Sequence, residues 1–296
     1  MKHISLFLAA CLLLFTLCSC GAPAQSWDIA ATTLPVYEFT ARLCEGTGLT
    51  VTRLVTESVS CLHDYSLNVN QVRAAESAQL IVISGAGLEE FMEDILSGKQ
   101  IIDSSENIEI IECEDAHEHE HDHDHGHDHH HDVDSHIWLS PENASVMANN
   151  ICAGLCKNYP EYAETFRSNL PALLADIDAV QNYGNEQLGS LSCRDLITFH
   201  DGFGYFAAAF DLHILKAVEE ESGAEASAAE LKELIQLVRQ HQLPAIFTET
   251  NGSDSAASVI SRETEAAVFT LDMAMSGDSW FDAMYHNIDT LKEALE

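Results

Sequence analysis

Histidines are concentrated in one segment in the middle of the chain. Residues 117–131 hold nine of them, interleaved with aspartates and glutamates. Imidazole nitrogen binds zinc, copper, nickel and iron well, and short histidine-rich tracts are typical of metal binding. The neighbouring carboxylates can accept imidazole N–H bonds and attract cations, although a merely solvated acidic loop has a similar composition. The tract therefore predicts an auxiliary site for transition metals, made of His117, His119, His121, His123, His125, His127, His129, His130 and His131.

Four other polar residues stand where predicted strands end or helices begin. His63 follows the second predicted strand, and His136 precedes a predicted helix; His200 and Asp272 each follow an apolar strand. In open α/β sheets, ligands bind outside the carboxyl ends of the strands. Two of the four lie on each side of a long predicted helix, so a cleft between two lobes could bring them together.

Predicted strands and helices alternate along most of the chain. This alternation favours an α/β fold with mostly parallel sheets, in two lobes joined by a long rigid helix, with a metal cleft between the lobes. Pro171 should kink the long helix. The expected organisation is a signal peptide at 1–20, an N-terminal lobe at 21–158 with a mobile histidine-rich insertion at about 114–134, a linker helix at 159–190 and a C-terminal lobe at 191–296. The strands are expected at 27–32, 49–55, 79–84, 107–112, 195–199, 245–248 and 267–271.

The N-terminus has the pattern of an export signal. A basic start precedes the apolar run Ile4–Leu17, which is shorter than the roughly 20 residues of a transmembrane helix. The following LCSCG resembles a bacterial lipobox, in which Cys20 would carry the lipid, while cleavage after Ala24 is the alternative. We expect an exported protein, lipid-anchored to the outer face of the cell membrane or located in the periplasm.

Charge and cysteine content narrow the possible functions. The formal net charge is −35, with only 13 lysines and arginines, so the surface should repel nucleic acid. Six cysteines remain after the leader and allow 15 disulfide connectivities, among which sequence cannot choose. No CxxC occurs, which argues against a thiolate zinc site of the usual spacing.

Several segments carry a resemblance to a known family. They are ATTLPVYEF, CLHDYSLNVNQVRAAESAQLIVISGAGLE, the histidine tract, HIWLSPENA, ITFHDGFGYFAAAF, and AIFTETNGS followed by TLD, from about residue 32 to residue 272. They resemble the metal-binding solute-binding proteins of bacterial ABC importers, in particular the zinc branch (ZnuA-like). The resemblance implies that His63, His136 and His200 bind the metal. Asp272 matches the fourth position, where water is the alternative.

The resemblance also bears on the choice of metal. The manganese binders of this family usually place a carboxylate where His200 stands, and imidazole at that position favours zinc. The chain departs from the family in having Leu62 and Ser135, where proline often precedes the histidine. Asp201 is a candidate partner that orients an imidazole, or else a helix cap, and Glu249 could face the cleft or solvent.

The predicted function is binding without turnover. The protein would capture Zn²⁺ outside the cell as a monomer and deliver it to an ABC permease and its ATPase. A manganese receptor of the same family, or a surface zinc scavenger or adhesin, remains an alternative. A zinc hydrolase with three histidines and a water is disfavoured, because no HExxH falls on a predicted helix and no GxSxG occurs.

Overall fold

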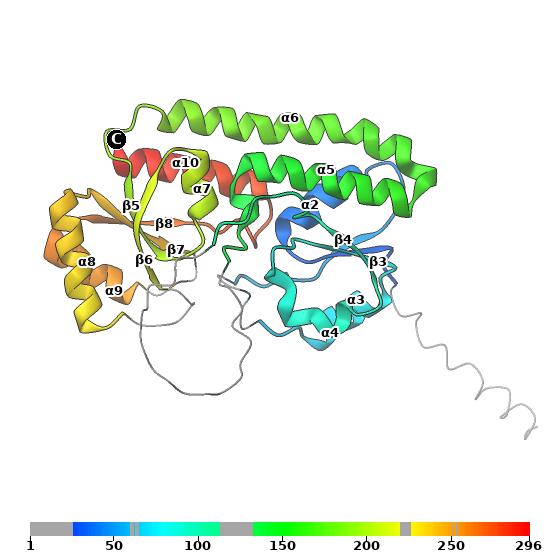
Figure 1. Ribbon diagram of the computed structural model, residues 1–296, viewed down its shortest axis with the longest axis horizontal. Coiled ribbons are helices and arrows are strands. Elements are labelled where there is room, and N and C mark those ends of the chain that lie inside the picture. The colour runs from blue at the N-terminus through cyan, green and yellow to red at the C-terminus, as the bar shows by residue number, and fades with distance from the viewer. Residues whose placement is uncertain are drawn as a thin grey trace, which may run out of the picture.

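Two parallel four-stranded sheets form the centres of two lobes in the computed structural model (Figure 1). The structure describes residues 26–59, 62, 65–112, 133–219, 226–250, 252 and 254–296. The predicted leader with Cys20, the histidine tract and His63 lie outside these residues. Among the described helices, none combines the length and the apolar composition needed to cross a membrane.

The N-terminal sheet has the strand order β2-β1-β3-β4. Its central strands are short apolar runs whose side chains are almost entirely buried, as expected of a parallel sheet covered on both faces. The strands are β1 (Ile29–Ala31), β2 (Val51–Arg53), β3 (Leu80–Ile83) and β4 (Gln100–Asp103). The helices are α2 (Leu34–Leu43), α3 (Val69–Ser77) and α4 (Glu93–Leu96), with a 3₁₀ turn η1 (Leu88–Met92).

The C-terminal sheet repeats this plan with the order β6-β5-β7-β8. The strands are β5 (Asp195–His200), β6 (His213–Glu219), β7 (Ala245–Glu249) and β8 (Ala267–Leu271). The helices are α7 (Gly204–Ala209), α8 (Ala228–His241), α9 (Ser255–Thr264) and α10 (Trp280–Leu295). Helix α8 begins with a capping box, in which Ser227 Oγ accepts from the backbone N–H of Glu230.

One long helix runs over both lobes. Helix α6 (Ala163–Leu188) continues through Pro171 and lies along α5 (Pro141–Asn158) and α10 (Figure 1). Helix α5 starts with proline at its first position and a serine cap, Ser140, which suits a helix start. The predicted two-lobe α/β fold with a long joining helix is confirmed.

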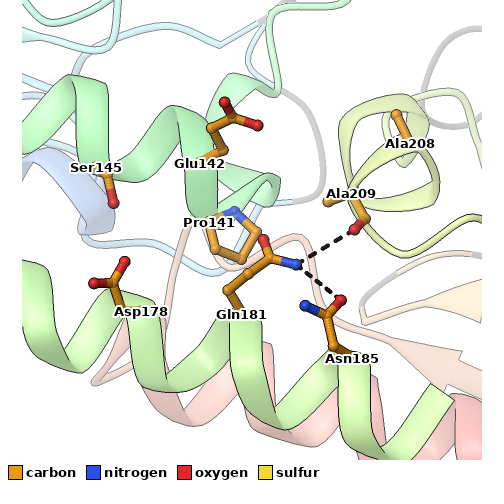
Figure 2. A pocket seen from close by; sticks show the side chains of 8 residues that line it. All are labelled: Pro141, Glu142, Ser145, Asp178, Gln181, Asn185, Ala208 and Ala209. Atoms are coloured by element: carbon orange, nitrogen blue, oxygen red, sulfur yellow. Dashed lines mark hydrogen bonds between the residues drawn. The ribbon is translucent and has the colours of Figure 1, made fainter. Parts of the chain in front are cut away.

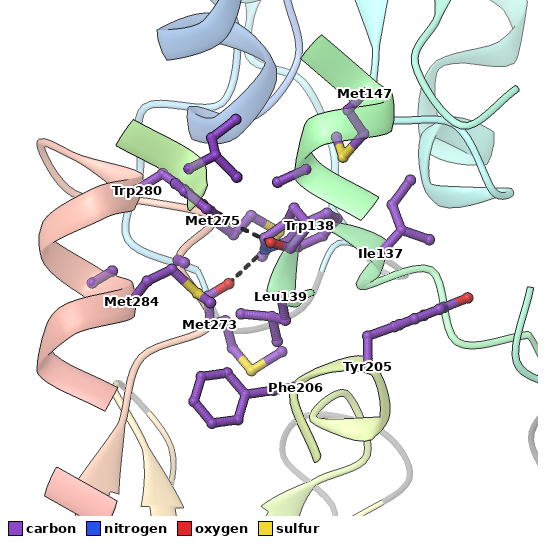
Figure 3. Close-up of a cluster of buried hydrophobic side chains, with 14 of the residues drawn as sticks. Ile137, Trp138, Leu139, Met147, Tyr205, Phe206, Met273, Met275, Trp280 and Met284 are labelled. Atoms are coloured by element: carbon purple, nitrogen blue, oxygen red, sulfur yellow. Dashed lines mark hydrogen bonds between the residues drawn. The ribbon is translucent and has the colours of Figure 1, made fainter. Parts of the chain in front are cut away.

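Buried tryptophans tie the lobes together. Trp138 Nε1 donates to the carbonyl of Met273 at 2.7 Å, and Trp280 Nε1 donates to the carbonyl of Trp138 at 3.0 Å (Figure 3). Leu34 N–H donates to the carbonyl of Met275 at 3.1 Å. The segment that follows β8 is thus bonded directly to the N-terminal lobe.

One predicted strand is not formed, and two strands of the structure were not predicted. Residues 107–112 do not form a strand, because their backbone groups bond elsewhere: Ile111 N–H donates to the Tyr205 hydroxyl, and Ile111 C=O accepts from Asp134 N–H. Strands β4 and β6 are edge strands with mixed polar character, and periodicity did not reveal them.

The four described cysteines, Cys44, Cys152, Cys156 and Cys193, are free thiols.

Candidate metal site

Two of the predicted metal-binding histidines meet in the folded chain. His136 and His200 are 3 % and 2 % exposed, and their Nε2 atoms lie 3.4 Å apart. Their rings are nearly perpendicular, with centroids separated by 5.1 Å. One histidine precedes α6 in the chain and the other follows it, so the fold unites residues 64 positions apart.

Apolar segments hold both imidazoles in place. His200 is the last residue of β5, whose preceding side chains from Leu196 to Phe199 are buried. His136 is followed by the 3₁₀ turn η2 (Ile137–Leu139), in which every side chain is fully buried. The ring of His136 packs edge-on against Trp138 with a centroid distance of 5.3 Å. Since their neighbours are anchored in the core, the two histidines cannot turn to solvent without disrupting it.

Asp134 is a partner of His136 that sequence reasoning missed. Its Oδ1 accepts from the backbone N–H of His136 at 2.9 Å and lies 2.9 Å from His136 Nδ1. The carboxylate is 5 % exposed. With the proton on Nδ1 facing this oxygen, the lone pair of Nε2 is directed toward His200. The only sequence signal was a carboxylate two residues before a histidine.

Glu249 lies behind the other imidazole. It ends β7, is 4 % exposed, and places Oε2 at 3.8 Å from His200 Nδ1. Asp201, the other residue predicted to orient His200, is exposed. Glu249 from the neighbouring strand is therefore a buried acid beside this ring, and the predicted role of Asp201 stays a prediction.

Asp272 contributes to the turn that follows β8. Its Oδ1 accepts from Ala274 N–H at 2.7 Å, and its backbone N–H and C=O both bond to the Asn287 amide at 2.7 Å. Within the described ranges, no three His, Cys, Asp or Glu side chains gather closely enough to hold a metal ion. His63 falls outside those ranges, so its role and that of Asp272 stay predictions.

Gly202 fills the space beside both imidazoles. A Cβ atom at this position would lie 2.8 Å from His136 Nδ1, 2.8 Å from His200 Cδ2 and 2.6 Å from Met273 Cε. Only a residue without a side chain allows these groups to approach as they do. Its location in the HDGFGYF segment was visible in the sequence, but this contact between lobes was not.

A surface pocket at the junction of α5, α6 and α7 is separate from the histidines. It has a volume of about 520 Å³, and Gln181 crosses it to donate to the carbonyl of Ala209 and to Asn185 Oδ1 (Figure 2). Its lining is Pro141, Glu142, Ser145, Asp178, Gln181, Asn185, Ala208 and Ala209. No described histidine or thiol lines it, so it lacks the donors expected of a zinc site.

Comparison with known proteins shows which family the chain belongs to. A family model described as "ZnuA: Zinc-uptake complex component A periplasmic" matches residues 29–294. The chain belongs to the ZnuA family.

Individual relatives of the ZnuA family are moderately similar. The chain is 31% identical over 242 residues to "High-affinity zinc uptake system protein ZnuA" of Haemophilus ducreyi, covering 76% of this chain and 78% of that protein. It is 29% identical to "Zinc-binding lipoprotein AdcA" of Streptococcus pneumoniae strain TIGR4, over its whole length but only 62% of the relative. A solved structure, "Crystal structure of ZnuA", matches with a TM-score of 0.77 and 26% identity, covering 92% of this chain and 100% of that one.

The spacing between His136 Nε2 and His200 Nε2 suits the binding of one metal ion by both atoms. Two nitrogens bound to a tetrahedral zinc ion at about 2.0–2.1 Å lie about 3.3–3.4 Å apart. The Nε2 atoms of His136 and His200 are 3.4 Å apart. Both histidines have a carboxylate on the Nδ1 side, so each can offer the Nε2 lone pair to the same cation.

Proposed function

We propose that the protein is the extracytoplasmic zinc-binding component of an ABC import system. It captures Zn²⁺ and delivers the ion, without chemical turnover, to a membrane permease driven by its ATPase. The observation that carries this proposal is the pair of buried Nε2 atoms 3.4 Å apart. Membership of the ZnuA family and the uptake-system name of the Haemophilus ducreyi relative support the transport role.

His63 and a fourth donor would complete the zinc site. Three neutral imidazoles and one oxygen make an ordinary tetrahedral set for zinc. His63 supplies the third imidazole in this proposal, and either Asp272 or a water supplies the oxygen. Because Asp272 Oδ1 already accepts from Ala274 N–H, its other oxygen would be the one that binds.

The nitrogen-rich donor set favours zinc over manganese. Imidazole suits zinc, whereas Mn²⁺ favours carboxylate and water oxygens. The two acids close to the pair, Asp134 and Glu249, lie on the Nδ1 sides of the rings, away from the meeting point of the Nε2 atoms. This arrangement leaves nitrogen as the main donor and makes a manganese receptor the weaker reading.

Two further segments would support zinc capture outside the cell. The nine-histidine tract would collect zinc through several weaker sites, and a lipid on Cys20 would hold the protein at the membrane surface. The name of the AdcA relative, a zinc-binding lipoprotein, supports the anchor. We propose a monomer, since a single chain contributes imidazoles from both lobes.

The decisive test is a competition titration of Zn²⁺ against Mn²⁺ on the metal-free mature chain lacking residues 116–132. One tight zinc equivalent, little affected by manganese, is expected. His200→Ala should weaken zinc by more than the ~10–100-fold typical of losing a partner outside the ligand set. His213→Ala serves as the matched control, because His213 is an exposed imidazole at the opposite end of the same sheet.

Two outcomes contradict the proposal. If the loop-deleted chain binds no zinc tightly, the pair is not the receptor site and the histidine tract is the main metal-binding element. If manganese binds as tightly as zinc, the chain is a manganese-type receptor of the same family.

A further inference from the structure

We propose that Asp134 and Glu249 form a pair of positioning carboxylates, each lying on the Nδ1 side of one imidazole and together supplying the two negative charges that balance Zn²⁺. This inference rests on the proposed zinc-binding function and deepens it. It assigns the charge balance of the site to two buried acids that do not touch the ion.

Asp134 is held rigidly behind His136. One oxygen, Oδ1, faces both the backbone N–H and Nδ1 of His136 at 2.9 Å, which fixes the ring orientation as well as the main chain. The backbone N–H of Asp134 donates to the carbonyl of Ile111 at 2.9 Å. Its second oxygen has Gly204 beside it, where a Cβ would come within 2.8 Å. The Asp134 carboxylate is therefore held by its bonds to His136 on one side and by the backbone of Gly204 on the other.

Glu249 takes the corresponding place behind His200. Strands β5 and β7 are neighbours in parallel register, with Thr198 paired to Phe247, so the two strands end side by side at His200 and Glu249. The carbonyl of Glu249 accepts from Gly252 N–H at 3.0 Å, and a Cβ at Gly252 would come within 2.8 Å of Glu249 Cγ. Its Oε2 lies 3.8 Å from His200 Nδ1, which is longer than a hydrogen bond, so Glu249 acts on this ring through its nearby charge.

Burial makes the charges of these acids matter. Asp134 and Glu249 are 5 % and 4 % exposed, so water screens them poorly. Burying a carboxylate is costly unless a compensating positive charge or hydrogen bonds are present. With water as the fourth ligand, the three neutral imidazoles and the water carry no charge, so these two acids are the buried charges beside the described pair that can balance a divalent ion. The site is therefore arranged for a doubly charged cation.

A positioning role and a structural role predict opposite effects of neutralising these acids. Asp134→Asn keeps an oxygen that can accept from His136, but removes the negative charge; Glu249→Gln does the same behind His200. In the metal-free protein this removes a buried charge, so thermal stability should stay the same or rise. Zinc binding, in contrast, should weaken because the ion loses its compensating charge.

The experiment measures the zinc dissociation constant by chelator competition at pH 8 and the Tm of the metal-free protein, both on the full mature chain. Asp134→Asn and Glu249→Gln should each weaken zinc binding by ~10–100-fold without lowering the metal-free Tm. Asp201→Asn is the matched control, since it neutralises an exposed acid adjacent to His200. It should change the dissociation constant by less than about threefold.

Two results would overturn the inference while leaving the proposed function intact. One is that Asp134→Asn and Glu249→Gln bind zinc as the unmodified chain does. The other is that they lose binding only in parallel with a lower metal-free Tm, which is the signature of a structural role. Absence of tight zinc binding in the unmodified chain would overturn the proposed function and this inference together.

Discussion

Gly202 sets how closely the two imidazoles can approach. Its backbone φ is not in the left-handed region, so alanine is permitted there by the main chain and is opposed only by its neighbours. A Cβ would lie 2.8 Å from His136 Nδ1 and from His200 Cδ2, which is closer than carbon atoms normally pack. Gly202→Ala should therefore push the rings apart and weaken zinc binding about tenfold or more, as an overpacking cost of ~1–3 kcal/mol implies.

Gly154→Ala is the control for this substitution. Gly154 is also tightly packed, since a Cβ there would lie 2.5 Å from Ile102 Cγ1, but it belongs to α5 in the N-terminal lobe. Both variants should lower the Tm, and only Gly202→Ala should raise the zinc dissociation constant measured by chelator competition. Equal zinc affinity in the two variants would show that Gly202 does not control the spacing of the pair.

Glu89 is a buried acid in the N-terminal lobe with an unusual proton affinity. Its Oε1 accepts from Thr32 Oγ1 at 2.6 Å and from Ser84 N–H at 2.7 Å, and Oε2 accepts from Gly85 N–H at 3.0 Å. Burial outweighs these bonds and raises the pKa of Glu89 from 4.5 to about 7. The folded state therefore binds this proton more tightly than the unfolded state, so the contribution of Glu89 to stability falls as the pH rises from 4.5 to about 7 and is constant above that.

Glu89→Gln should remove this pH dependence. Between pH 4.5 and about 7, the unmodified chain should lose about 3 kcal/mol of unfolding free energy relative to the variant. Urea unfolding of metal-free protein at pH 4.5, 6 and 7.5 measures it. Glu90→Gln, which changes the adjacent exposed acid, should leave the difference flat. A flat profile for Glu89→Gln as well would mean that Glu89 has an ordinary pKa.

At the scale of elements, the sequence predicted the central strands of both sheets, whereas the edge strands β4 and β6 were missed. The runs that became β3, β5 and β7 are rich in apolar residues, and burial on both faces favours such composition. Edge strands have one side without a partner strand and often carry polar or charged residues, so the sequences of β4 and β6 resemble those of loops. Residues 107–112 were predicted as a strand but do not form one, because Ile108 and Ile110 pack against the core without joining the sheet.

The candidate site was predictable only where a strand or helix boundary marked it. His136 and His200 stand at such boundaries, and this position indicated that they could meet. Asp134 sits at the end of an acidic, histidine-rich stretch, where one carboxylate is not distinguishable from the others by type. The packing of Gly202 against His136 arises from contact between lobes, which periodicity does not encode. The contacts of Asp134 and Gly202 with His136 could therefore be found only from the folded structure.

At the scale of the molecule, one large hydrophobic cluster extends through both lobes, while two smaller clusters of described residues each belong to a single lobe. The largest buried cluster contains Phe39 from α2, Ile177 from α6 and Leu291 from α10, and so extends through both lobes and the long helix. Trp138 and Trp280 add the buried hydrogen bonds that link the lobes (Figure 3). Lobes joined in this way resist wide hinge opening, so zinc capture should depend on local adjustments around the pair rather than on large closure.

A shared core predicts that the lobes unfold together. Urea unfolding of the metal-free mature chain should give coincident transitions by tryptophan fluorescence, which reports chiefly on the buried Trp138 and Trp280, and by far-UV circular dichroism, which reports on the helices of both lobes. Trp27→Phe removes the partly exposed tryptophan outside this junction and should leave the coincidence unchanged. Two separated transitions would show that each lobe folds on its own core. The junction would then be a hinge able to open, and zinc capture could proceed by lobe closure.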